Sequence, residues 1–202
     1  MNTTAEEIIS FWFADARGDP EKAMHRKAFW FEANAATDKE IARRFSASVQ
    51  GAARGELAAW EQDPQSSVAL VVLLDQFPRN LFRGTAEAFQ YDSRALAVAS
   101  RAVAADHPKR LSVPEQGMLL MPYEHSEDAS VQRAGVALLR KLLDRADQSW
   151  KPFVRGSLDF AVQHLEIVER FGKFPHRNAV LGRSSTPAEQ AYLDGGGESF
   201  GQ

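Results

Sequence analysis

Hydrophobic residues recur along this chain at the spacing of amphipathic helices. The pattern is clearest in residues 128–147, where Val131, Ala134, Leu138 and Leu142 follow one another at intervals of three or four positions. This interval puts apolar side chains on one face of a helix. Patterns of this kind, together with the breaks between them, predict helices over residues 5–14, 21–35, 38–53, 66–76, 92–106, 113–121, 128–147, 156–171, 175–181 and 187–194.

One segment, residues 68–74, is apolar on all sides. Its valines would also suit a β-strand, but no other segment reads as a partner strand, and a lone strand could not satisfy its backbone hydrogen bonds. We therefore predict a buried central helix here. We expect Pro78 to end it, because proline has no amide hydrogen to donate and restricts the residue before it. Further turns are predicted at Pro64, Pro108 and Pro122.

Short signals mark several predicted helix ends. Four times a serine or threonine is followed three residues later by glutamate, which lets the hydroxyl and the carboxylate cap the first helical turn together. These pairs are Thr4–Glu7, Thr37–Glu40, Ser112–Glu115 and Thr186–Glu189. Gly172 and Gly182 are expected to close the helices before them in the left-handed conformation, which glycine adopts without strain.

These elements predict a single all-α domain over residues 1–194, built as an antiparallel array of about ten helices with no sheet. The glycine-rich residues 195–202 are expected to form a flexible tail. The sequence contains no linker long enough to separate two domains. It also lacks a repeat with a period of about 34 residues, so self-similarity does not indicate a repeat array.

The composition narrows the classes of function. The chain has 202 residues, with 24 basic and 27 acidic side chains and a net charge of −3, so it has no general attraction to nucleic acid or to an anionic membrane. The absence of cysteine excludes disulfides and thiolate-bound zinc. The first residues are acidic where a signal peptide would be basic, and the longest apolar run is too short to cross a bilayer. We therefore expect a soluble, cytoplasmic protein.

A short phrase occurs twice in the chain. Residues 77–80 and residues 174–178 each place phenylalanine and proline before arginine and asparagine, the second time with a histidine in between. Proline stiffens the backbone and arginine offers a rigid fork of donors, so each copy could bind a carboxylate or phosphate. The alternative is structural, with Asp75 paired to Arg79 and the amide side chains capping helix ends. The candidate binding residues in and around the two copies are Asp75, Gln76, Arg79, Asn80, Arg83, Arg177 and Asn178.

The polar segment 121–128 places a histidine among carboxylates. The pKa of histidine lies near neutrality, so His125 could act as a general base whose ring is oriented by Glu124 or Glu127. In the structural alternative Ser126 caps the following helix, and the two acidic residues after it occupy the first helical turn. That alternative accounts for residues 126–128 but leaves residues 123–125 unexplained.

Tyr123 and His164 complete the candidate binding residues. His164 lies on a helix face with apolar neighbours, a position more typical of a core histidine than of a ligand. The histidines at 125, 164 and 176 could converge with a carboxylate, but no pair has the spacing of metal ligands on a helix. The sequence also lacks a phosphate-binding loop and a dinucleotide fingerprint. We therefore expect neither a metal nor a cofactor.

Several longer motifs occur in order, namely FWF (11–13), LLDQFPRNLFRG (73–84), MPYEHSED (121–128), RFGKFPHRN (170–178), LGRSST (181–186) and TPAEQAYL (186–193). Together they resemble the motifs of a bacterial family catalogued as domain of unknown function 924. The resemblance extends from about residue 6 to residue 194. It implies a tetratricopeptide-like helical fold, and it adds no mechanism because the family has no established activity. Lys173, where arginine is common, and Tyr123 depart from the family pattern.

The preferred hypothesis from the sequence is a binding module. In it a concave groove captures a peptide or a small anionic ligand, a surface that helical arrays readily offer. Arg79, Arg83 and Arg177 would anchor the ligand, and Asn80 and Asn178 would fix its orientation.

Two other hypotheses stay open. The first is a hydrolase-like enzyme in which His125 acts as general base on a carboxylated or phosphorylated small molecule, with Glu124 or Glu127 orienting the imidazole. The second is a purely structural network of polar side chains at helix ends. Both functional hypotheses predict that the two copies of the repeated phrase lie close together, with Glu124 and His125 beside them. The sequence does not indicate the oligomeric state.

Overall fold

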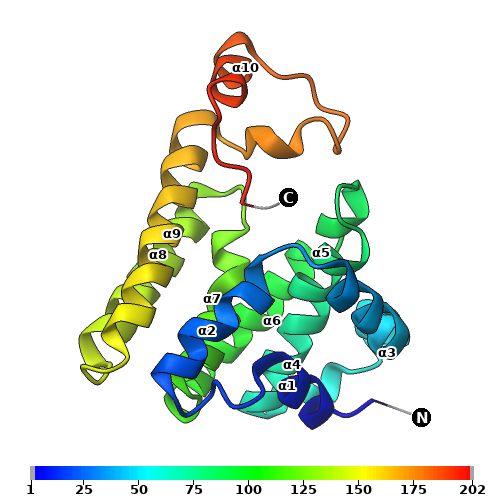
Figure 1. The fold of residues 1–202 in the computed structure, drawn as a ribbon, viewed down its shortest axis with the longest axis vertical. Helices are drawn as coiled ribbons and strands as arrows, with labels where there is room; N and C mark the ends of the chain where they lie inside the picture. The colour runs from blue at the N-terminus through cyan, green and yellow to red at the C-terminus, as the bar shows by residue number, and fades with distance from the viewer. Residues whose placement is uncertain (1–2, 201–202) are drawn as a thin grey trace.

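The computed structural model describes residues 3–200, which form helices and turns without a strand (Figure 1). The predicted all-α class is thus confirmed. The helices are α1 Ala5–Phe13, α2 Pro20–Phe31, α3 Ala35–Arg54, α4 Pro64–Val71, α5 Phe77–Leu81, α6 Asp92–Ala104, α7 Val113–Glu124, α8 Ala129–Arg145, α9 Lys151–Phe171 and α10 Pro187–Asp194, with 3-10 turns η1 Ala58–Gln62, η3 Ala86–Phe89, η4 His107–Arg110 and η5 Pro175–Arg177, and a π-helical turn η2 Val72–Gln76.

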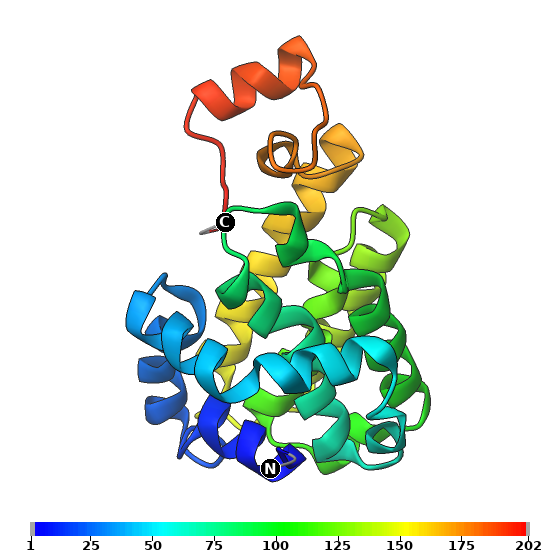
Figure 2. The same cartoon turned by 90° about the vertical axis from the view of Figure 1, so that its right-hand side faces the viewer.

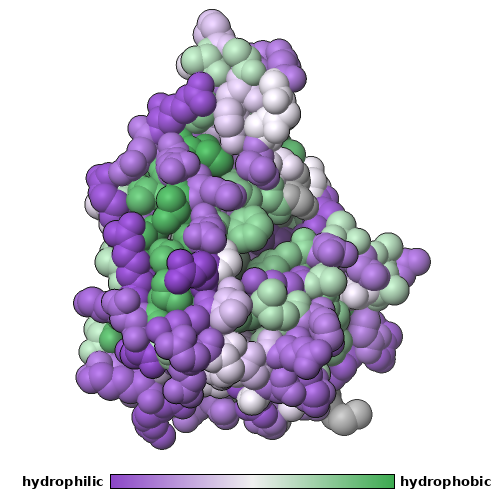
Figure 3. Space-filling view, turned by 60° about the vertical axis from the view of Figure 1, so that its left-hand side comes forward, coloured by the Kyte–Doolittle hydropathy of each residue, from purple (hydrophilic) through white to green (hydrophobic). Residues whose placement is uncertain are grey.

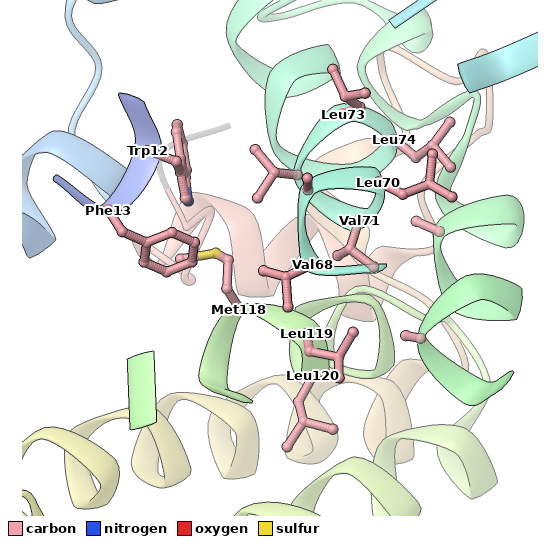
Figure 4. Close-up of a cluster of buried hydrophobic side chains, with 14 of the residues drawn as sticks. Trp12, Phe13, Val68, Leu70, Val71, Leu73, Leu74, Met118, Leu119 and Leu120 are labelled. Atoms are coloured by element: carbon pink, nitrogen blue, oxygen red, sulfur yellow. The ribbon is translucent and has the colours of Figure 1, made fainter. Parts of the chain in front are cut away.

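Helix α4 and the π-helical turn form the centre of the molecule, as the sequence predicts. Every residue from Val68 to Leu74 is buried. Their side chains lie against Trp12 and Phe13 of α1 and against Met118 and its neighbours in α7 (Figure 4). The all-round apolar character of the segment therefore reflects packing on every side.

The prediction that Pro78 ends this helix is wrong. Helix α4, the π-helical turn and α5 follow one another without a break, and Pro78 lies in the first turn of α5. The backbone N–H of Phe77 donates to the carbonyl of Val72, five residues back. In the first turn of α5, a missing amide hydrogen costs little. The chain therefore stays helical through Pro78, directly after the wider π-helical turn.

Pro122 is likewise no turn, because it lies inside α7. Proline removes one backbone hydrogen bond, but the helix continues for one more turn and the N–H of His125 donates to the carbonyl of Met121 at 3.0 Å. The helix therefore ends three residues later than the sequence suggests, directly before His125.

Three of the four predicted capping boxes are present, at Thr4, Ser112 and Thr186. The fourth prediction, at Thr37, is wrong. The side chain of Asn34 accepts from the amides of residues 36 and 37 at 2.9 and 3.1 Å, so α3 begins three residues earlier. Asparagine caps the free amides of the first turn, so Thr37 lies inside the helix and caps nothing.

The two predicted glycine caps differ in outcome. Gly172 ends α9 with φ of 70°, as expected. Gly182 also has a positive φ of 65°, but it lies in a run of turns, because the helix predicted over residues 175–181 is only the 3-10 turn Pro175–Arg177.

Helices α8 and α9 form a long antiparallel pair along one side of the molecule, and α10 lies at the end farthest from α1 (Figures 1 and 2). After α10 the chain returns toward the middle of the molecule (Figure 1). No helix among the described residues is long and apolar enough to cross a membrane. The tetratricopeptide-like arrangement of the helices stays a prediction.

Candidate functional site

A cavity of about 270 Å³ lies between α2, the helical run around Gln76, the end of α7, and α9. Its wall includes both polar and apolar side chains. Figure 3 shows the face that carries α2, α8 and α9, where hydrophobic residues gather beside a recess. The polar side chains include Gln76, Asn80, Glu124, His125 and His164, and the apolar side chains include Trp30, Phe31, Met121, Phe160 and Phe200.

Asp75, at the π-helical turn, is the carboxylate that orients His125. Its side chain is fully buried, and its Oδ1 lies 2.7 Å from Nδ1 of His125. The amide of Gln76 donates to its other oxygen, and Nη1 of Arg79 lies 3.5 Å from Oδ1. Burial opposes ionisation, but the neighbouring His125 and Arg79, with a hydrogen bond from the Gln76 amide, hold the pKa of the Asp75 carboxyl well below its usual range.

This pairing sets the tautomer of His125. An ionised carboxylate only accepts hydrogen bonds, so Nδ1 carries the hydrogen and Nε2 is the basic nitrogen. Burial, followed by the charge of Arg79, lowers the pKa of His125 in spite of the opposing charge of Asp75. His125 lines the cavity, and its Nε2 makes no hydrogen bond to any residue within 3–200. The ring is therefore a neutral base at the cavity wall.

Glu124, the last residue of α7, lies in an environment that favours the protonated acid, unlike that of Asp75. Burial, with the charge of Asp75, raises the pKa of its carboxyl to about 8. Its Oε1 lies 3.4 Å from Nδ1 of His164. Burial lowers the pKa of His164 to about 3, and the same Nδ1 lies 2.9 Å from the carbonyl of Phe160. At neutral pH this contact thus joins a neutral imidazole to a protonated acid.

Asp75, Glu124 and His125 together form what we call the acid–base cluster. Neighbouring groups whose pKa values are pushed apart are typical of sites that give and take protons. The sequence points to His125 and Glu124, but assigns the orienting role to the wrong carboxylates. The partner is Asp75, 50 positions away.

Arg79 and Arg177, one from each copy of the repeated phrase, lie together as expected. Arg79 donates from both terminal nitrogens to the carboxylate of Asp92, at 2.9 Å each. Arg177 lies 3.6 Å from the same carboxylate and donates to the carbonyl of His125 at 3.1 Å. We call Arg79, Asp92 and Arg177 the arginine network. The sequence does not reveal Asp92, which opens α6 without a motif.

Asn80 and Arg83 bind Asp38 of α3. The amide of Asn80 donates to Oδ1 at 2.8 Å, and Nη2 of Arg83 lies 3.2 Å from the same oxygen. Asn178 instead donates to Ser185 at 3.1 Å and to Glu189 at 3.0 Å, near α10. The two asparagines therefore do not converge on one ligand.

Two predicted roles near His125 are wrong. Glu127 accepts from Arg183 at 2.6 and 2.9 Å and from the backbone N–H of Phe174 at 2.8 Å, so it does not orient the imidazole. Ser126 does not cap α8, because the carboxylate of Asp128 accepts from the amides of the first turn. Aspartate supplies both the acceptor and the negative charge that a helix start favours.

Tyr123 faces away from the cavity, toward α8. It is buried, and a Cβ on Gly135 of α8 would lie 2.6 Å from the Cβ of Tyr123. This glycine thus allows α7 and α8 to approach closely. The tyrosine therefore serves packing at the helix junction and does not line the cavity.

Phe200 reaches the cavity from the end of the chain. Its ring stacks on His164 with centroids 3.5 Å apart and an angle of 19° between the ring planes. Its φ is 53°, an uncommon value for a residue with a side chain. The segment predicted as a flexible tail, residues 195–202, thus brings Phe200 against the cavity, and its last two residues lie outside the described part.

The fold and this cavity define a class: all-α proteins with a buried carboxylate–histidine pair in the wall of a small cavity. The chain belongs to the family of bacterial proteins of unknown function called DUF924, whose model matches residues 8–197. It is similar to the structure of a protein of unknown function from Agrobacterium tumefaciens, with 37% identity, a TM-score of 0.79, and coverage of 95% of this chain and 97% of that one. A comparison with curated proteins finds no match.

Proposed function

We propose that the cavity is the active site of an enzyme that uses general acid–base chemistry on a small molecule. His125 is the base, Asp75 positions it, and Glu124 is the acid. The observation that carries the proposal is the 2.7 Å hydrogen bond between Asp75 and Nδ1 of His125, which leaves Nε2 as the basic nitrogen of a residue lining the cavity. A base oriented by a carboxylate is a recurring arrangement in hydrolytic sites.

The chemistry would be hydrolysis of an ester or amide bond. Nε2 of His125 takes a proton from a water molecule as its oxygen attacks the carbonyl carbon. Glu124, protonated at neutral pH because its pKa is raised to about 8, gives its proton to the leaving oxygen or nitrogen as that bond breaks. Water adds across the bond, and solvent carries a proton from His125 back to Glu124 before the next cycle.

The binding hypothesis in its original form has less support. Its three arginine anchors already contact carboxylates of the protein, Arg79 and Arg177 at Asp92 and Arg83 at Asp38. A cavity of about 270 Å³ is also slightly smaller than most ligand sites, which favours a small molecule over a peptide. The structural hypothesis suits the arginine network better than it suits the acid–base cluster.

A panel of small carboxylated esters and amides tests the proposal with the wild type, His125→Gln and Asp75→Asn. We expect kcat to fall by about 100-fold or more in both variants, the usual contribution of a positioned acid or base. Circular dichroism and thermal unfolding serve as folding controls. An active wild type whose rate is unchanged by His125→Gln in a folded variant would remove the histidine from the chemistry.

A further inference from the structure

Lys27 of α2 is a cation in the cavity wall that pairs with no carboxylate among residues 3–200. Its side chain lines the cavity and is half-buried. It makes no hydrogen bond or ion pair with any residue within 3–200. Its ammonium lies 5.0 Å from the centroid of the Phe153 ring. Burial lowers the pKa of Lys27, so a neighbouring anion would relieve a desolvated charge.

Gly156 of α9 leaves room for this ammonium. A Cβ at position 156 would lie 3.0 Å from Nζ of Lys27, closer than ordinary contact. The absence of a side chain there lets the lysine lie against α9 beside the cavity. Phe160 of the same helix, one turn further on, also lines the cavity.

The other cations of the cavity wall differ from Lys27 in their partners. Arg79 forms a two-point contact with Asp92, and Arg83 contacts Asp38 at 3.2 Å. With these charges balanced inside the protein, Lys27 is the group available to attract an anionic part of a ligand. Glu32, a further wall residue, adds a negative charge that opposes a ligand with two negative charges.

The cavity also presents large apolar side chains to water. Phe31 is 47% exposed and Phe160 is 53% exposed, among the few large hydrophobic residues of the described chain with exposure this high. Both belong to the cavity wall. Exposed aromatic side chains beside a polar site are typical of surfaces that cover the apolar part of a ligand.

We propose that the cavity binds a small monocarboxylate with an apolar body, its carboxylate on Nζ of Lys27 and its body against Phe31 and Phe160. This inference rests on the proposed function, because it names the class of substrate that the proposed active site would take. Binding can nevertheless be measured without turnover, which separates the two proposals experimentally.

The probe is 3-phenylpropanoate, compared with its neutral analogue 3-phenylpropanamide and with the dianion phenyl phosphate, by isothermal titration calorimetry. We expect saturable binding of the carboxylate. The amide should bind at least about tenfold more weakly, because it loses a charge-assisted hydrogen bond. The phosphate should also bind at least about tenfold more weakly, because Glu32 in the cavity wall repels its second negative charge. Lys27→Met should abolish the preference for the carboxylate over the amide. Lys27→Arg should keep most of it, because the charge remains.

Lys141→Met is the matched control, since it removes the same charge from an exposed position on α8. It should leave all three affinities unchanged. The proposal is overturned if the wild type does not bind 3-phenylpropanoate, if the amide or the phosphate binds as tightly, or if Lys27→Met keeps the preference. His125→Gln should still bind the carboxylate, so an inactive protein that binds this probe would contradict only the proposed function.

Discussion

The arginine network and the acid–base cluster lie side by side, yet they have opposite electrostatic character. In the arginine network Asp92 faces two cations, and the guanidinium of Arg177 lies 4.5 Å from each of the rings of Phe89 and Phe174. In the acid–base cluster a neutral base and a protonated acid line a cavity. Residue types common in active sites thus occur in both regions. What distinguishes them is that the acid–base cluster leaves a basic nitrogen, Nε2 of His125, at the cavity wall, whereas Asp92 is occupied by the two arginines.

Asp92→Ala should have the largest effect on stability and breaks the arginine network. It leaves two buried guanidinium groups without their shared carboxylate, so we expect the free energy of unfolding to fall by about 3 kcal/mol or more. Denaturation by urea measures this change. Asp15→Ala is the control, because solvent screens its exposed ion pair with Lys22 and the loss of that pair should change stability little. Equal losses in the two variants would contradict a structural role for the network.

Glu124→Gln tests the acid–base cluster through pH. The folded-state pKa of Glu124 is raised to about 8 from the ordinary 4.5. The folded protein therefore binds the proton more tightly, and the stability due to this group is present at low pH and lost as pH rises through about 8. Glutamine cannot ionise and removes this dependence. We expect the wild-type Tm to fall relative to that of the variant by at least about 4 °C between pH of about 5 and about 8.

Thermal unfolding of both proteins across this pH range gives the comparison directly. Parallel curves would mean that Glu124 ionises normally in the folded protein, and the proposed acid would then be absent at neutral pH. Glu169→Gln, which changes a carboxylate on the outer face of α9, should leave the wild-type curve unaltered in shape.

Phe200→Ala should have the smallest effect. It tests whether the ring of Phe200 shields His164 from water. Losing the half-buried ring should cost about 1 kcal/mol. Because water then reaches His164, the pKa of this histidine should rise from about 3 toward its ordinary 6.5. Nuclear magnetic resonance of the imidazole nitrogens follows this titration. Phe31→Ala, which removes a cavity ring that does not stack on His164, should leave the pKa of His164 unchanged.

The sequence predicts the helices well because helical periodicity and capping are local. It predicts His125 and Glu124 because a histidine among carboxylates is visible in one short segment. It misses Asp75 as their partner because the two segments meet only through folding, and because Pro78 reads as the end of a helix that in fact continues. Lys27 and Phe200 have no local signal at all, since a lone lysine on an amphipathic helix and a phenylalanine after three glycines are ordinary features.

The π-helical turn at residues 72–76 has a consequence for how the protein family can change. Such a turn holds one residue more than an α-helix of the same length. Deleting a single residue there would restore regular winding and rotate everything beyond it by about 100° relative to the first part of the helix. Asp75 and Arg79 would then no longer keep their present positions relative to His125. Insertions and deletions at this turn should therefore mark the relatives whose chemistry has diverged.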